Sequence, residues 1–190
     1  MNNTNNFKEL LKTHGLQVPD EKVYIKVGNA KELIQQAFIE FVPNFKWTKE
    51  YDKVSEWMEN NEGLGLFLYG NCGRGKTMLA KYIIPSILIA KTRKVLRYYD
   101  IQDLKSNYDE IISKKLFSLD DVGTEEVILD YGNKKDAFCE IMDLVEKKSK
   151  LIVITSNLTY DQLIARYGIR IMDRIKSTTK RILFEGESFR

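Results

Sequence analysis

The stretch from residue 70 to residue 77, GNCGRGKT, constrains this chain more than any other part of its sequence. It follows an apolar run, GLGLFLYG, and it has two glycines separated by four residues and followed by Lys76 and Thr77. This pattern is typical of a loop that joins a buried strand to a helix and binds phosphate groups. We therefore predict that a nucleotide binds here.

Each residue type in this loop has a physical role in binding phosphate. Glycine lets backbone N–H groups approach phosphate oxygens with no Cβ in the way, and a helix beginning near Gly75 directs the positive end of its dipole at the same oxygens. We expect Lys76 to reach the terminal phosphates and the Thr77 hydroxyl to bind Mg²⁺. The residues predicted to contact the nucleotide are Gly70, Asn71, Cys72, Gly73, Arg74, Gly75, Lys76, Thr77 and Met78.

A second segment, LFSLDDVG, is an apolar run that ends in two acids, Asp120 and Asp121. Buried carboxylates are costly without a partner, so two of them at the end of a strand favour a bound cation. In enzymes with this type of phosphate loop, the first acid supports Mg²⁺ and the next can orient or deprotonate the attacking water. We therefore predict that Asp120 joins Thr77 at the metal site and that Asp121 joins Lys76 in catalysis.

From Gly65 onward, predicted strands alternate with predicted helices, which is typical of a three-layer α/β fold with a mostly parallel sheet. The strands are expected at 66–69, 95–99, 116–120, 151–155 and 181–184, and the helices at about 76–90, 101–114, 134–148, 159–166 and 168–176. Residues 1–45 are interpreted as a short N-terminal helical arm, with a helix in KELIQQAFIEFV. Another helix is predicted in TKEYDKVSEWMENN, with Thr48 as its N-cap.

A GTPase is one alternative, because residues 120–123 fit Asp-x-x-Gly and NKKD, residues 133–136, fits the guanine-recognition pattern Asn-Lys-x-Asp. The guanine pattern belongs to a separate parallel strand, which needs a crossover of about a dozen residues or more. Only the nine residues from Thr124 to Gly132 lie between the two patterns. NKKD is therefore interpreted as the polar start of the next helix, and we expect adenine nucleotides.

A nucleotide kinase is a further alternative that suits the length of the chain. Such an enzyme needs an arginine-rich lid and a pocket for the phosphoryl acceptor. The segment after Asp121 has no insertion of that size, and the arginines gather near the C-terminus instead.

Four segments in order, GNCGRGKT, LDDVG, VITSN and RYGIRIMDRI, give residues 45–190 a resemblance to the DnaC/IstB-type AAA+ ATPases, the helicase-loader group. The resemblance implies an AAA+ ATPase core at residues 46–190, with no C-terminal lid domain. It also implies that Asp120 and Asp121 are the Walker B pair. Asn157 resembles the sensor residue that holds the attacking water and the γ-phosphate.

The same resemblance assigns an arginine finger to the segment RYGIRIMDRI. Arg170 matches the finger that one subunit donates to the γ-phosphate of its neighbour, and Arg174, one helical turn further on, is the alternative. A finger acting in trans implies an ATP-dependent homo-oligomeric ring or spiral. No role is assigned to Arg190.

The resemblance implies that the chain loads a replicative helicase onto single-stranded DNA, or that it assists a transposase. We look for DNA contacts in DIQDLKSNYDEIISKK, where Lys105, Lys114 and Lys115 could supply charge and Tyr108 a stacking surface. A binding module that uses ATP only to set its oligomeric state is a third interpretation, from a different functional class.

Composition favours a cytoplasmic protein with no membrane segment. The N-terminus has no apolar core of a signal peptide, and the longest apolar stretch, YIIPSILIA, is about half the length of a membrane span. Cys72 and Cys139 form no disulfide framework or metal-site pattern. The net charge of +3 gives no argument for nucleic acid on its own.

Overall fold

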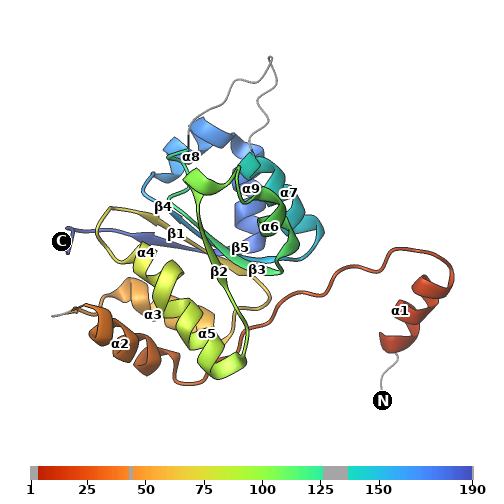
Figure 1. Ribbon diagram of the computed structural model, residues 1–190, viewed down its shortest axis with the longest axis horizontal. Coiled ribbons are helices and arrows are strands. Elements are labelled where there is room, and N and C mark those ends of the chain that lie inside the picture. Colours follow the sequence, from red (N-terminus) through yellow and green to blue (C-terminus); the bar gives the residue numbers. More distant parts are fainter. Residues whose placement is uncertain (1–3, 43–44, 126–136, 190) are drawn as a thin grey trace.

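Five parallel strands form a sheet at the centre of the molecule (Figure 1). The computed structural model describes residues 4–42, 45–125 and 137–189. The strands are β1 (Gly65–Gly70), β2 (Arg97–Asp100), β3 (Leu116–Asp120), β4 (Leu151–Ser156) and β5 (Thr179–Phe184). Their order across the sheet is β2-β3-β4-β1-β5, and each neighbouring pair is parallel. All five overlap the strands predicted from the sequence.

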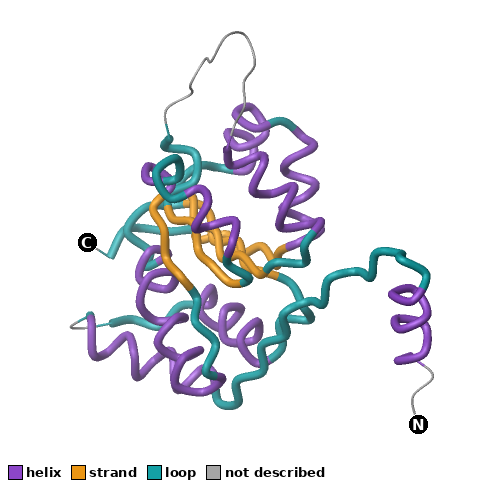
Figure 2. Tube along the Cα trace, turned by 45° about the vertical axis from the view of Figure 1, so that its right-hand side comes forward, coloured by secondary structure: helices purple, strands orange, loops and turns teal. Residues whose placement is uncertain are grey.

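Helices cover both faces of this sheet (Figures 1 and 2). On one face lie α2 (Ala30–Phe41), α3 (Lys49–Glu59) and α5 (Ile84–Thr92), and on the other lie α6 (Tyr108–Ser113), α7 (Ala137–Lys147), α8 (Tyr160–Tyr167) and α9 (Ile169–Thr178). Successive strand residues point to opposite faces, so Leu66 and Leu68 pack in one core cluster whereas Phe67 packs in the other. The predicted three-layer fold is confirmed.

The helical run after the phosphate loop is continuous but not uniform. It consists of α4 (Lys76–Met78), a π-helical turn η1 (Leu79–Ile83) and then α5. Pro85 lies in the first turn of α5 and supplies no N–H to the preceding turn. A π-helical turn at this point is one way in which a helix accommodates such a loss. The buried Ser118 hydroxyl on β3 donates to the Ala80 carbonyl in that turn, at 3.2 Å.

The segment after β2 differs from the single helix predicted at 101–114. A short 3₁₀ turn, η2 (Ile101–Asp103), is followed by α6, which begins only at Tyr108. The Ser106 hydroxyl and the Asn107 amide both donate to the Asp103 carbonyl. The backbone N–H of Asn107 donates to the same carbonyl, and the Leu104 N–H donates to the Ile101 carbonyl three residues before it. This 3₁₀ geometry does not continue as an α-helix, so the helix starts later than its sequence pattern predicts.

The N-terminal segment has two parts that behave differently. Helix α1 (Thr4–Thr13) stands apart from the sheet and its helices (Figure 1). Ile25, Val27 and the buried face of α2, in contrast, belong to the same core cluster as β1 and β5. Thr48 does lie at the N-cap of α3, but within the described residues its side chain makes no capping hydrogen bond. The division of the chain at residue 45 stays a prediction.

Helix α7 buries Phe138, Ile141, Met142 and Val145, and Cys139 packs at the edge of the same cluster. The segment NKKD lies outside the described residues. Among the helices of the described ranges, none combines the length and the apolar character needed to cross a bilayer.

Candidate functional site

The phosphate loop runs from the end of β1 to the start of α4, as the sequence predicts. Gly75 is the residue that makes this geometry possible, because it lies at the N-cap of α4 with a φ of 83°. This left-handed conformation favours glycine, and a Cβ here would lie 2.6 Å from the Tyr51 hydroxyl oxygen. Gly70 and Gly73 also have positive φ angles, of 107° and 71°. The loop therefore turns sharply at the edge where the parallel strands end.

Lys76 places a buried positive charge inside this loop. Its side chain is 5% exposed, and its Nζ donates to the Gly70 carbonyl at 2.9 Å and to the Asn71 carbonyl at 2.7 Å. A buried ammonium group is tolerated only when its N–H groups have acceptors, and here the loop itself supplies two. A cation held at a loop of this kind fits a polyphosphate ligand.

Thr77 and Asp120, 43 residues apart in sequence, meet at the base of the loop. The Thr77 hydroxyl donates to Oδ1 of Asp120 at 3.1 Å. The Thr155 hydroxyl on β4 donates to the same oxygen, and the Tyr98 hydroxyl on β2 donates to Oδ2 at 3.0 Å. Hydroxyl and carboxylate oxygens are the ligands that Mg²⁺ prefers, so the residues present fit the metal ion that the sequence implies.

Asp121 and Asn157 also lie next to one another, at the ends of β3 and β4. Asp121 has a φ of 61°, a left-handed conformation that Asp adopts more readily than most residues. Its N–H donates to the Thr155 hydroxyl at 2.9 Å, and the Asn157 side-chain amide donates to its Oδ1 at 2.5 Å. The structure thus brings together Lys76, Thr77, the acid pair and Asn157 from three separate segments of the chain.

Sequence reasoning did not identify Tyr98 or Thr155 as members of this site. Burial is the main reason that the pKa of the Tyr98 phenol is raised, and the neighbouring Asp120 carboxylate raises it further. The Tyr98 phenol thus stays protonated and keeps donating to Asp120. The signal that could have found these residues is register, because β2 and β4 both end beside β3, although a single sequence does not reveal which strands are neighbours.

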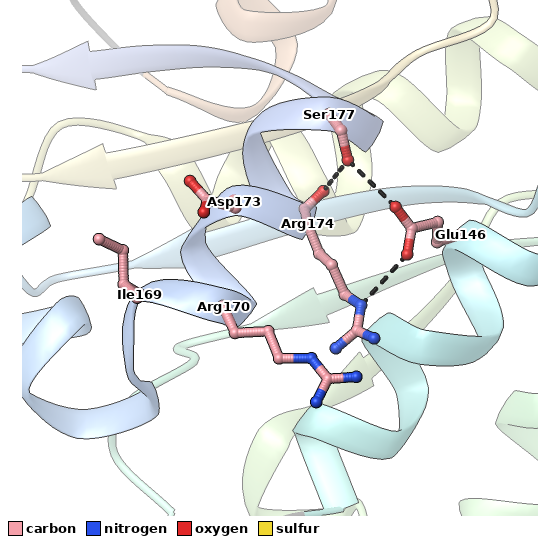
Figure 3. Close-up of a pocket in the computed structure, with 6 residues that line it drawn as sticks. All are labelled: Glu146, Ile169, Arg170, Asp173, Arg174 and Ser177. Atoms are coloured by element: carbon pink, nitrogen blue, oxygen red, sulfur yellow. Dashed lines mark hydrogen bonds and ion pairs between the residues drawn. The ribbon is translucent and has the colours of Figure 1, made fainter.

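Arg170 and Arg174 project from α9 beside an open surface pocket (Figure 3). Arg174 is held on the molecule, since its guanidinium lies 2.5 Å from the Asp143 carboxylate and 3.1 Å from that of Glu146 on α7. Its side chain is 14% exposed. Arg170 is exposed, and within the described residues it has no hydrogen bond or ion pair. The two candidates for the finger therefore differ in what holds them.

Arg74 has a different place from the one its position in the loop suggests. It is only 7% exposed, and its guanidinium contacts Glu50 on α3 at 3.3 Å. The side chain is thus directed at α3. Only the backbone of Arg74 remains available to a phosphate.

Most of the residues predicted to contact DNA form hydrogen bonds or ion pairs with other parts of the fold. The Tyr108 hydroxyl donates to Glu140 at 3.0 Å, Lys114 pairs with a carboxylate of its own helix, and Lys115 donates to a carbonyl before β4. Lys105 is exposed. Of the four residues predicted to contact DNA, Lys105 is the one best placed to do so.

Comparison with known proteins places this geometry in a family. The model of a family described as Novel STAND NTPase 3 matches residues 45–185, which include the loop, the acid pair, Asn157 and both arginines. No curated protein matches the chain by sequence.

Solved structures share the fold at low sequence identity. The DnaC helicase loader has a TM-score of 0.53 and 20% identity, over 85% of this chain and 94% of that one. DnaI gives 0.55 and 22%, over 85% and 82% of the two chains. The replication initiator DnaA bound to AMPPCP and single-stranded DNA gives 0.54 and 20%, over 82% and 51%. At these identities the matches establish a DnaC-like P-loop NTPase fold.

Proposed function

The chain belongs to the Novel STAND NTPase 3 family, and from this premise we propose that it is a Mg²⁺-dependent ATPase of the DnaC type that loads a replicative helicase onto single-stranded DNA. The observation that supports this most directly is the meeting of Thr77 and Asp120 at 3.1 Å. The loop hydroxyl and the first strand-end acid are the two groups that hold Mg²⁺ in proteins with this loop. They are far apart in sequence and come together only in this fold.

Each polar group of the site has a role in this proposal. Lys76 binds the terminal phosphates in place of the two loop carbonyls that it now contacts. Thr77 and Asp120 hold Mg²⁺, which neutralises charge on the phosphates. Asp121 orients or deprotonates the attacking water, and Asn157 keeps the Asp121 carboxylate in position through its amide.

Arg170 is the proposed finger, and it acts on the nucleotide of a neighbouring subunit. The exposed Arg170 guanidinium has no partner among the described residues and is available to a phosphate on another molecule, whereas Arg174 is already held by two carboxylates. A site completed by a neighbour implies head-to-tail assembly into a ring or spiral. We therefore expect ATP to promote a homo-oligomer.

Single-stranded DNA and a replicative helicase are the proposed partners. This proposal is supported by the likeness in fold to the DnaC helicase loader and to the initiator DnaA bound to single-stranded DNA. The exposed Lys105 is a further support. A transposase is the alternative partner. The compartment that we propose is the cytoplasm, with residues 46–190 as the ATPase core and residues 1–45 as an arm.

The test is the rate of phosphate release together with the mass in solution, for the wild type and Lys76→Ala, each with and without single-stranded oligonucleotide. We expect Mg²⁺-dependent hydrolysis and ATP-dependent assembly in the wild type only. Equal phosphate release by the two proteins would refute the assigned site.

The same samples separate the alternatives. Assembly with ATP but negligible turnover would favour a binding module whose nucleotide sets its oligomeric state. Transfer of the γ-phosphate to an added nucleoside monophosphate by a monomer would favour a nucleotide kinase. Stimulation by a purified transposase rather than a helicase would favour the transposition helper.

A further inference from the structure

The last residues of the chain lie against the outer side of the phosphate loop. The Asn71 side-chain amide donates to the Gly186 carbonyl at 2.9 Å, and the Phe189 N–H donates to the Gly73 carbonyl at 3.0 Å. Gly73 is packed so closely that a Cβ there would lie 2.0 Å from the Ser188 hydroxyl oxygen. These bonds use a loop carbonyl and a side-chain amide, so they consume none of the loop N–H groups that a phosphate requires.

Arg74 connects this C-terminal segment to helix α3. One end of its guanidinium donates to the Glu187 carbonyl at 3.2 Å, and the other pairs with the Glu50 carboxylate at 3.3 Å. The guanidinium carbon also lies 4.2 Å from the centre of the Phe189 ring. Arginine suits such a junction because its planar group can stack and donate in two directions at once.

The Arg74–Glu50 pair is buried, and this makes it sensitive to its surroundings. The side chains are 9% and 3% exposed, and a buried ion pair is favourable only when further hydrogen bonds support it. The Glu185 N–H, at 3.4 Å from the Glu50 carboxylate, is one such support from the C-terminal segment. The Tyr51 hydroxyl donates to the backbone carbonyl of Arg74 at 2.9 Å, so it positions this residue without bonding either charged group.

We propose that residues 185–189, here called the C-terminal clamp, hold the phosphate loop in its nucleotide-binding conformation, with Arg74 and Glu50 as the positioning residues that connect the clamp to α3. This inference rests on the proposed nucleotide binding at the loop. A loop that is already ordered loses less conformational entropy when a ligand binds, so the closed clamp favours nucleotide. Coupling of this kind is reciprocal, and bound nucleotide must favour the closed clamp by the same factor.

The experiment measures the Kd of a fluorescent ATP analogue with Mg²⁺ for four proteins: wild type, Phe189→Ala, Lys76→Ala and Phe7→Ala. Loss of the Phe189 ring removes a stacking contact on Arg74, so we expect binding to weaken by roughly threefold to tenfold with a melting temperature lowered by no more than about 4 °C. Phe7→Ala is the control, because it removes a ring of the same size from an exposed position at the opposite end of the chain. It should bind like the wild type.

A second readout separates positioning from general stability. Hydrogen exchange at the Phe189 amide should slow when the analogue binds to the wild type, by at least the factor by which Phe189→Ala weakens binding. Arg74→Lys should bind the analogue less tightly than the wild type but more tightly than Arg74→Ala. Lysine keeps the positive charge beside Glu50 but lacks the planar guanidinium that donates in two directions.

The outcomes distinguish this inference from the proposed function. Failure of the wild type to bind, or equal binding by Lys76→Ala, would overturn nucleotide binding and the clamp with it. The clamp alone would be overturned if the wild type binds normally and Lys76→Ala does not, but Phe189→Ala binds with wild-type affinity. In that case exchange at the Phe189 amide of the wild type would also be unchanged by the analogue. Tighter binding by Phe189→Ala would also overturn it, because the segment would then oppose the nucleotide.

Discussion

Replacing Arg170 and Arg174 by alanine, one at a time, should produce opposite patterns of damage. Arg174 is held by Asp143 and Glu146 at 2.5 Å and 3.1 Å. Partly exposed ion pairs contribute about 0.2–1 kcal/mol each, so the loss of both pairs in Arg174→Ala should lower the free energy of unfolding by about 0.4–2 kcal/mol. For a chain of this size, that corresponds to a melting temperature lower by about 1–8 °C. Arg170 has no such partners among the described residues, and Arg170→Ala should change the free energy of unfolding by less than about 0.5 kcal/mol.

Catalysis should respond in the reverse order. An arginine finger contributes about 10³-fold or more to the rate where it acts, so Arg170→Ala should nearly abolish ATP hydrolysis in the assembled state while keeping the wild-type Kd for the analogue within a few fold. Arg174→Ala, assayed well below its melting temperature, should retain most of the rate. Phosphate release and thermal melting on the same samples provide both measurements.

A mixing experiment tests whether the finger acts in trans. Arg170→Ala supplies intact loops and acid pairs, and Asp121→Asn, which keeps Lys76 and Thr77 for binding ATP, supplies intact fingers. About a quarter of the interfaces in an equal mixture therefore combine the two intact halves. Activity should return on mixing two inactive proteins. A melting temperature lowered by Arg170→Ala together with turnover lost in Arg174→Ala would reverse the assignment, and absence of complementation would refute action in trans.

Three further predictions concern single contacts. Ser118→Ala removes the hydroxyl that donates to the Ala80 carbonyl in the π-helical turn, and should lower the free energy of unfolding in urea by about 1–3 kcal/mol, whereas Ser113→Ala at an exposed position should have little effect. Asp120→Asn should remove the dependence of analogue affinity on Mg²⁺, checked by titration with the metal and with EDTA, and an unchanged Mg²⁺ dependence would exclude Asp120 from the metal site. Burial raises the pKa of Tyr51 from 10.0 to about 12. The neutral phenol therefore stabilises the fold fully below pH 10, and this stabilisation is lost as the pH rises toward 12. Over that range the free energy of unfolding should fall by about 2 kcal/mol more in the wild type than in Tyr51→Phe, and equal falls in the two proteins would contradict this assignment.

Much of the fold was predictable because its signals are local. The run GLGLFLYG and the glycines that follow it dictate a buried strand and a sharp turn, whatever the rest of the chain does. The five predicted strands overlap the observed ones for the same reason. The helix predicted at 101–114 was wrong over its first half, where a 3₁₀ bond from the Leu104 N–H to the Ile101 carbonyl closes the first turn and α6 begins only at Tyr108.

The candidate site was predictable as a set of residues but not as an arrangement. The pairing of Thr77 with Asp120 follows from the known chemistry of the loop. The contributions of Tyr98 and Thr155 depend instead on which strands are neighbours. Strand order is a property of long-range contacts, and a single sequence does not contain it.

By itself, then, the sequence determined the phosphate loop, the acid pair and the alternation of strands with helices, since each depends on residues within a few positions of one another. Only the tertiary structure distinguishes Arg170 from Arg174, because the carboxylates that hold Arg174 come from α7. It also brought Glu50, Arg74 and Phe189 into one contact. These contacts join charges and rings from distant parts of the chain. Periodicity and spacing describe only residues close together in sequence, so they could not predict such contacts.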